Sequence, residues 1–152
     1  MKNKSYIRIT KEFKFEMGHA LKGYDGPCRN IHGHSYGLKV TIAGEPSMNE
    51  SDPKLGMVMD FGDLKEIVRK AVISEFDHAL VLSKEMPEAL LSELKSNFQK
   101  IILVDYQPTS EMMIQDFALR IKRLLPDNVE LVHLLLRETV TSYAEWFAHE
   151  NK

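Results

Sequence analysis

The chain has 152 residues, of which 43% are hydrophobic and 28% charged, a composition typical of one folded domain. Its formal net charge is -2 and it contains no long lysine or arginine run, so neither nucleic acid nor an anionic membrane is indicated as a partner. No stretch approaches the roughly 18 apolar residues of a membrane helix, and Cys28 is the only cysteine, which suits a reducing compartment. We therefore expect a single soluble, cytoplasmic domain over residues 1–152.

Two long strands are predicted in the first third of the chain. Apolar residues occupy alternate positions from residue 7 to residue 19, namely Ile7, Ile9, Phe13, Phe15 and Met17. A period of two predicts a strand with one buried face. After a loop rich in glycine and proline, residues 32–42 alternate again, and this second strand is expected to pair with the first.

Helices are predicted from residue 60 and from residue 109. Asp60 follows a short predicted strand at 57–59 and is a candidate N-cap, after which apolar residues recur at helical spacing to residue 72. Pro108 and Thr109 open the other helix, which Pro126 ends. Residues 83–107 form an insert with a short helix (87–98) and an extra strand (100–105), and residues 129–138 and 142–147 form a closing hairpin.

This order of elements predicts an α+β fold, with helices on one face of a four-stranded antiparallel sheet. Such a sheet has two open edges, which proteins usually cover or pair. An oligomer that joins sheets edge to edge is therefore expected.

Three of the six histidines follow the pattern H-x12-H-x-H, at His19, His32 and His34. Residues two apart in a strand point to the same face and lie about 6.6 Å apart. His19 shares its parity with Met17 on the neighbouring strand, so all three imidazoles are expected to converge. Three imidazoles with an open fourth position are typical of a catalytic zinc site, which favours a metal over the alternative of separate core or surface histidines.

Cys28 lies four residues before His32, on the glycine-rich loop. It could be a fourth zinc ligand in a structural site, or a thiolate beside the metal that acts as a catalytic base. A small buried apolar residue is the third interpretation. The spacing alone does not choose among these three.

The carboxylates of Asp77 and Glu138 are further candidate functional groups. Asp77 and His78 follow the first long helix and could form an acid–base pair, although an acid and a histidine at a helix end are common. Glu138 is predicted in a closing strand beside apolar residues, where a carboxylate is unlikely to be left unpaired. An ion pair with Arg137, Arg120 or a neighbouring subunit is the structural alternative.

Six motifs, in this order, resemble the family of 6-pyruvoyl-tetrahydropterin and 6-carboxytetrahydropterin synthases. They are FEMGH (15–19), CRNIHGHSY (28–36), MVMDFGDLK (57–65), FDH (76–78), PTSE (108–111) and ET (138–139). The resemblance implies the tunnelling fold, in which α+β subunits join their sheets into a barrel. It also implies a homohexamer with active sites between subunits.

The resemblance further implies roles for the residues of these motifs. By it, His19, His32 and His34 bind Zn²⁺, Cys28 is the catalytic cysteine, and Asp77 and His78 are its acid–base partners. Glu138 anchors the pterin, and Thr109, Ser110 and Glu111 line the pterin pocket.

The spacing Cys-x3-His-x-His resembles the 6-carboxytetrahydropterin synthases of the queuosine (7-deazaguanine) pathway. These lyases convert 7,8-dihydroneopterin triphosphate to 6-carboxytetrahydropterin, acetaldehyde and triphosphate. A 6-pyruvoyl-tetrahydropterin synthase is the alternative enzyme, since the insert at 83–107 and Leu82 both depart from the compact queuosine-pathway pattern. A non-catalytic, zinc-stabilised oligomer that binds pterins or purines is the alternative from another class.

Overall fold

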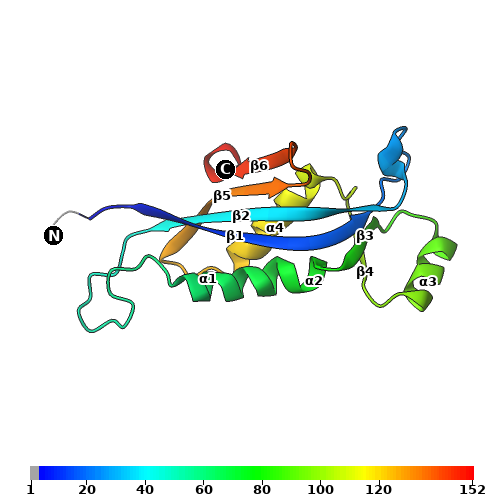
Figure 1. Cartoon of the computed structure of the whole chain (residues 1–152). Coiled ribbons are helices and arrows are strands. Elements are labelled where there is room, and N and C mark those ends of the chain that lie inside the picture. Colours follow the sequence, from blue (N-terminus) through cyan, green and yellow to red (C-terminus); the bar gives the residue numbers. More distant parts are fainter. Residues whose placement is uncertain (1–3) are drawn as a thin grey trace.

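A computed structural model describes residues 4–152 as one curled sheet with helices packed against it (Figure 1). The strands are β1 (Ile7–His19), β2 (His32–Gly44), β3 (Ala79–Ser83), β4 (Ile101–Val104), β5 (Val129–Arg137) and β6 (Tyr143–Phe147). The helices are α1 (Phe61–Val68), α2 (Ser74–Phe76), α3 (Glu88–Asn97) and α4 (Ser110–Leu124), and a π-helical turn (Arg69–Ile73) joins α1 to α2. None of the helices in residues 4–152 is both long enough and apolar enough to cross a membrane.

The sheet has six strands in the order β4-β3-β1-β2-β5-β6 and is mixed, so the predicted four-stranded antiparallel sheet is wrong. The pairs β1–β2, β2–β5 and β5–β6 are antiparallel, and the first and last of these pairs were predicted. However, β3 runs parallel to β1, and β4 runs parallel to β3. Parallel neighbours need a crossover connection, and α3 supplies it between β3 and β4. The insert predicted at 83–107 thus completes a β–α–β unit at one sheet edge.

Residues 57–59 form no strand, so the short strand predicted there is wrong. The Ser47 amide donates to the Met57 carbonyl at 3.0 Å, and the Gly56 amide donates to the Ser47 carbonyl at 2.8 Å. These bonds fold the segment back onto its own loop, so its backbone pairs with no strand of the sheet. Gly56 has φ of +81°, a left-handed conformation that favours glycine, and it turns the chain there.

The helix starts agree with their predicted caps. The Asp60 carboxylate accepts a hydrogen bond from the Gly62 amide at 2.6 Å, and the Thr109 hydroxyl accepts one from the Met112 amide at 3.3 Å. α4 ends at Leu124, before Pro126. These caps satisfy amides that would otherwise lack partners in the first turn.

The main core lies between the sheet and the helices α1, α2 and α4, on the face to which the odd-numbered residues of β1 point (Figure 1). Phe15 stacks on Tyr36 with ring centroids 5.1 Å apart, and Phe117 of α4 meets the edge of Phe15 at 6.1 Å. Burial of each such side chain contributes about 1.5–3 kcal/mol. The histidine-bearing ends of β1 and β2 therefore extend directly from the best-packed part of the sheet.

A smaller apolar cluster holds α3 in place. Leu91 of α3 packs with Leu82 and Ala20, whereas Val81 belongs to the main core. Because successive strand residues point to opposite faces, α3 covers the face of β3 that lies away from the main core. The insert is thus a packed element of the fold.

Candidate metal centre and active site

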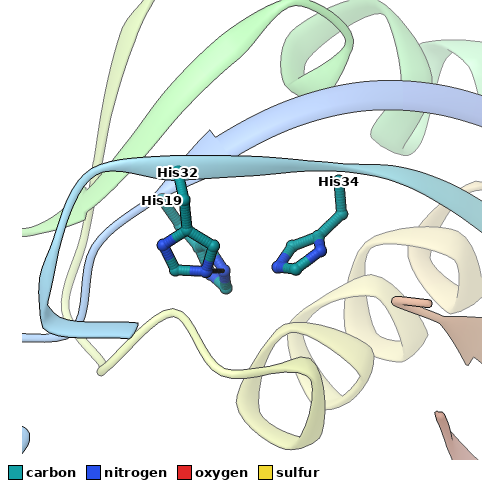
Figure 2. A group of neighbouring side chains, drawn as sticks. All are labelled: His19, His32 and His34. Atoms are coloured by element: carbon teal, nitrogen blue, oxygen red, sulfur yellow. Dashed lines mark hydrogen bonds between the residues drawn. The ribbon is translucent and has the colours of Figure 1, made fainter. Parts of the chain in front are cut away.

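The three histidines of the predicted metal site converge between the sheet and the start of α4 (Figure 2). In the β1–β2 register His19 lies opposite His32, and Met17 lies opposite His34. One nitrogen of each ring lies within 4.8 Å of the others, so the group could hold a metal ion. The parity argument from the two strands is therefore confirmed.

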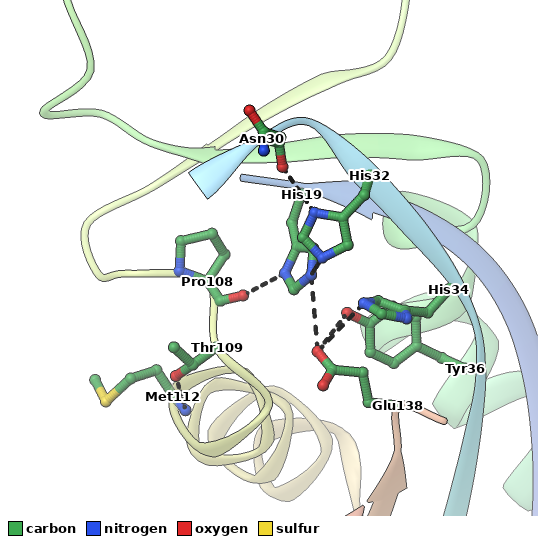
Figure 3. Close-up of polar contacts among 9 residues, drawn as sticks. All are labelled: His19, Asn30, His32, His34, Tyr36, Pro108, Thr109, Met112 and Glu138. Carbon is green, nitrogen blue, oxygen red and sulfur yellow. Dashed lines mark hydrogen bonds and ion pairs between the residues drawn. The ribbon is translucent and has the colours of Figure 1, made fainter. Parts of the chain in front are cut away.

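Backbone carbonyls fix the orientation of two of the rings. Nδ1 of His19 lies 2.7 Å from the Pro108 carbonyl oxygen, and Nδ1 of His32 lies 2.7 Å from the Asn30 carbonyl oxygen (Figure 3). A carbonyl oxygen can only accept, so each Nδ1 carries the proton and each Nε2 presents its lone pair. The two Nε2 atoms are 3.1 Å apart. This outer-shell arrangement is typical of metal-binding histidines.

Burial favours the neutral, metal-binding form of His19. Its side chain is 2% exposed, and desolvation is the largest cause that lowers its pKa, with the nearby His32 and His34 rings acting in the same direction. Nε2 of His34 is buried without a hydrogen-bond partner. A buried nitrogen without a partner requires an explanation, and a bound cation supplies one.

Glu138 and Tyr36 complete the polar wall around these rings (Figure 3). Oε1 of Glu138 lies 3.6 Å from Nε2 of His34 and 3.7 Å from Nε2 of His19. The Tyr36 hydroxyl donates to the same oxygen at 3.5 Å, and burial, followed by the Glu138 charge, raises the Tyr36 pKa. β5 ends at Arg137, one residue before the predicted strand end at 138, so Glu138 lies just beyond the strand. Its alternative pairing with Arg137 or Arg120 is not observed.

The start of α4 lies beside the histidines, as Figure 3 shows. Thr109 caps the helix, Glu111 is exposed in its first turn, and the hydroxyl of buried Ser110 has no hydrogen-bond partner. Within residues 4–152, Ser110 Oγ and His34 Nε2 are the only buried side-chain polar atoms without one. Unpaired backbone amides in the first turn of a helix also favour an electron-rich ligand.

Cys28 lies on a short 3₁₀ turn (Pro27–Arg29) and is half-buried. Its carbonyl accepts a hydrogen bond from the Leu21 amide at 3.0 Å, which ties the turn to the end of β1. The thiol is close enough to Tyr36 to contribute to its raised pKa, although less than burial and Glu138 do. Cys28 is not a member of the three-histidine metal group.

Asp77 and His78 form a pair of their own. Oδ1 of Asp77 lies 3.0 Å from Nδ1 of His78 and accepts the Glu16 amide at 2.9 Å, and this amide is the largest cause that lowers the Asp77 pKa. His78 has φ of +61°, a conformation that costs about 1–3 kcal/mol in a non-glycine residue and clusters at functional sites. Its side chain is 77% exposed.

Within one chain the Asp77–His78 pair stays apart from the metal group. No hydrogen bond or ion pair in residues 4–152 joins either residue to His19, His32 or His34. The pair is bound to the backbone of Glu16, whose side chain points to the face of β1 opposite His19. An open cleft of about 1010 Å³ lies beside the Asp77–His78 pair and also reaches His32 and His34. Its other lining residues include Glu16, Gly18, Gly33, Ser35 and Lys100.

Sequence comparison identifies the family. The pattern of the 6-pyruvoyl tetrahydropterin synthase family matches residues 8–149, nearly the whole chain. The chain belongs to the 6-pyruvoyl tetrahydropterin synthase family. The expectation that it is an enzyme of this family is thereby confirmed.

Relatives within the family carry a more specific name. A Haemophilus influenzae protein named 6-carboxy-5,6,7,8-tetrahydropterin synthase is 36% identical over 142 residues, which is 92% of this chain and 98% of that protein. A protein of the same name from Rickettsia felis is 33% identical over 141 residues, or 91% of this chain and 99% of its own length.

Two solved structures share the fold. The 6-pyruvoyl tetrahydropterin synthase of Caenorhabditis elegans superposes with a TM-score of 0.66 at 22% identity, over 97% of this chain and 99% of that one. An uncharacterized protein of Wolinella succinogenes gives a TM-score of 0.78 at 20% identity, over 95% and 99%. The tunnelling fold expected from the sequence motifs is therefore confirmed, with six strands in the sheet.

Tyr36 is the residue of this site to which the sequence motifs assigned no role. It shares the parity of His34 on β2, and β2 pairs with β5 so that Gly37 lies opposite Arg137. The next positions, Tyr36 and Glu138, therefore face each other. The alternation at 32–42 could have placed Tyr36 on the same face as His34. Its contact with Glu138 depends on the β2–β5 register, which the sequence does not reveal.

Proposed function

We propose that this chain is a zinc-dependent 6-carboxytetrahydropterin synthase that acts on 7,8-dihydroneopterin triphosphate. The observation that carries the proposal is the group of three imidazoles, with two Nδ1 atoms engaged by carbonyls and the ring nitrogens directed at one point. Three histidines with an open position are the ligand set of a catalytic zinc site. The names of the relatives at 33–36% identity favour the carboxy product.

Zinc at His19, His32 and His34 would polarise the side-chain oxygens of the pterin and acidify the neighbouring C–H bonds. The Cys28 thiolate is the base that removes a proton from the substrate side chain. His78, oriented by Asp77, returns or relays a proton at its imidazole. Triphosphate leaves once electrons accumulate on the adjacent carbon. Water then adds to C1′ of the side chain and the C1′–C2′ bond breaks, which leaves a carboxylate on the ring and releases C2′ and C3′ as acetaldehyde.

Glu138 and the start of α4 bind the pterin ring in this proposal. A carboxylate can accept two parallel N–H bonds from the aminopyrimidinone edge, which has the fork geometry of a guanidinium. Thr109, Ser110 and Glu111 line the ring pocket, and the unpartnered Ser110 hydroxyl offers a further hydrogen bond. A homohexamer, by family resemblance, would bring the Asp77–His78 pair of one chain to the metal group of another.

Product analysis tests this proposal. Purified, zinc-loaded protein is incubated with dihydroneopterin triphosphate, and the pterins, acetaldehyde and triphosphate are quantified. We expect 6-carboxytetrahydropterin and acetaldehyde in equal amounts. Formation of the 6-pyruvoyl compound without acetaldehyde would assign the alternative enzyme, and binding of pterin without any turnover would assign the non-catalytic binder.

A further inference from the structure

The peptide bond between Asp77 and His78 is held on both of its sides. Its N–H, which belongs to His78, donates to the Glu16 carbonyl of β1 at 2.6 Å. Its carbonyl, which belongs to Asp77, accepts a hydrogen bond from Nζ of Lys100 at 2.5 Å. The Asp77 side chain is also fixed, because its Oδ1 accepts the Glu16 amide. Both polar groups of this peptide are therefore bound to other segments of the chain.

The orientation of the His78 ring depends on this peptide. His78 has φ of +61°, a left-handed conformation that a non-glycine residue keeps only where the surrounding structure enforces it. The ring is mostly exposed, and within residues 4–152 the Asp77 carboxylate is its one hydrogen-bond or ion-pair partner. Because the side chain is so exposed, the backbone that carries it, rather than packing around it, decides where the imidazole points.

Lys100 reaches this peptide from the insert. It directly precedes β4, and its own carbonyl accepts the Leu80 amide of β3 at 3.0 Å. The side chain is half-buried, and in the part of the chain that the structure describes its ammonium forms no ion pair, so the Asp77 carbonyl is its one hydrogen-bond partner there. A partly buried ammonium needs such a partner to offset its lost hydration, and hydrogen bonds from a charged donor are stronger than neutral ones. The Asp77 carbonyl is thus firmly held.

We propose that Lys100 is a positioning residue for the Asp77–His78 pair: its ammonium fixes the peptide so that the His78 imidazole keeps the direction in which it exchanges a proton with the substrate. This inference rests on the proposed function, in which His78 returns or relays a proton. It also gives the insert a functional part, because α3 packs on β3 through Leu91 and Leu82, and β4, which follows Lys100, pairs with β3. In the proposed function zinc and the pterin ring are held by other residues, so loss of the lysine should slow the chemical step without weakening either.

Steady-state kinetics and zinc content of Lys100→Met test the inference. Methionine keeps an apolar stem like that of lysine and removes the ammonium. Misplacement of a reacting group by about 1 Å can cost about 100-fold in rate. We therefore expect kcat to fall by about 10- to 100-fold, with KM and zinc content within about twofold of the wild type. Lys100→Arg can still donate to the carbonyl and should regain most of the wild-type kcat.

Lys95→Met is the matched control. Lys95 is exposed on α3 in the same insert, and its side chain forms no hydrogen bond or ion pair with the other residues from 4 to 152. Its kcat should stay within about twofold of the wild type. An unchanged kcat in Lys100→Met, or an equal loss in Lys95→Met, would overturn the inference.

A double-mutant cycle separates the positioning of His78 from a general effect on the fold. If the lysine acts only through the imidazole, Lys100→Met should not slow the residual turnover of His78→Ala any further. A second loss of the same size in that background would refute the inference. The crystal structure of Lys100→Met should show the His78 ring turned from its wild-type direction, and an unmoved ring would contradict the proposal. Lys100→Gln, whose neutral side chain is one atom shorter, replaces Lys100→Met in all of these measurements if the latter does not fold.

His78→Ala alone separates this inference from the proposed function. If His78→Ala keeps full turnover, the acid–base assignment of the proposed function fails, and the role of Lys100 fails with it. If His78→Ala is strongly impaired while Lys100→Met is fully active, only the role of Lys100 is refuted.

Discussion

Cys28 is half-buried on a 3₁₀ turn and is not part of the metal group, which favours the catalytic interpretation among the three that its spacing left open. A thiol that acts as a base must reach the substrate, whereas a fourth ligand must reach the metal. We therefore expect the thiol to act in proton transfer.

We expect Cys28→Ala to keep its fold and about one zinc per chain, yet to lose turnover. Removal of a positioned general base costs about 100- to 10,000-fold in rate. Metal analysis and steady-state kinetics on the same preparation measure both properties. If the variant loses zinc in step with activity, Cys28 is a ligand.

Asp77 predicts an acid dependence of stability. The Glu16 amide, followed by the His78 charge, holds the pKa of Asp77 below its ordinary value, so the folded state favours the carboxylate. This contribution is fully present above about pH 4 and is lost as the pH falls through the lowered pKa. Wild type should therefore have a higher urea midpoint than Asp77→Asn at pH 6, and the gap should narrow towards pH 3. A gap that is constant over this range would contradict the assignment.

At the residue scale, the sequence predicted the histidines but not the groups that orient them. Strand parity was sufficient to place His19, His32 and His34 on one face. The carbonyl of Pro108, by contrast, meets His19 across 89 positions of the chain, so it depends on where α4 packs. Contacts of this kind follow from tertiary structure and have no local signal.

Among the elements, β3 and the segment at 57–59 show where periodicity fails. β3 reads Ala-Leu-Val-Leu-Ser without polar alternation, because the main core covers one of its faces and α3 the other. Residues 57–59 have strand-like composition, but their backbone bonds join them to their own loop. The long amphipathic helices and the two long strands, whose patterns extend over many residues, were predicted correctly.

A network centred on Arg120 joins elements on which the site depends. Nη1 of Arg120 donates to the Glu75 carboxylate at 2.6 Å, and Nε donates to the Asp116 carboxylate at 2.9 Å. Glu75 lies in α2, two residues before Asp77. Asp116 also accepts the Tyr106 hydroxyl at 2.6 Å, two residues before Pro108. One arginine thus connects the segment that carries the acid–base pair with the segment that orients His19.

We expect Arg120→Ala to lower the free energy of unfolding by about 1–3 kcal/mol, because it leaves partly buried carboxylates without their partner. Arg123→Ala is the matched control on the same helix, since Arg123 is exposed and forms no ion pair within residues 4–152. The control should stay within about 0.5 kcal/mol of the wild type. Urea denaturation checks both variants, and equal effects would refute a specific role for the network.

At the scale of the whole molecule, both edges of the sheet are open to pairing with another subunit. β4 and β6 each pair with one strand within the chain, which leaves a row of backbone groups open on either side. The Asp77–His78 pair also stays apart from the metal group of its own chain. We therefore expect a homo-oligomer whose active sites combine groups from two subunits.

Mixed oligomers test this sharing of sites. His32→Ala and His78→Ala should each be nearly inactive alone, whereas co-expressed subunits should recover a substantial fraction of the activity, because some sites then contain both intact groups. His32→Ala mixed with His34→Ala is the control and should recover none, since both changes affect the same metal group. Light scattering should show one oligomer size throughout. Recovery in neither mixture, or a fully active monomer, would place the whole site in one chain.

The dependence of turnover on metal content tests the central claim most directly. Metal-free protein is titrated with Zn²⁺ while the consumption of dihydroneopterin triphosphate is followed, in the wild type and in His32→Ala. We predict that wild-type turnover rises in proportion to added zinc and stops at about one ion per chain, and that His32→Ala neither retains the ion nor turns over. Full turnover without metal, or full zinc occupancy in His32→Ala, would contradict the account.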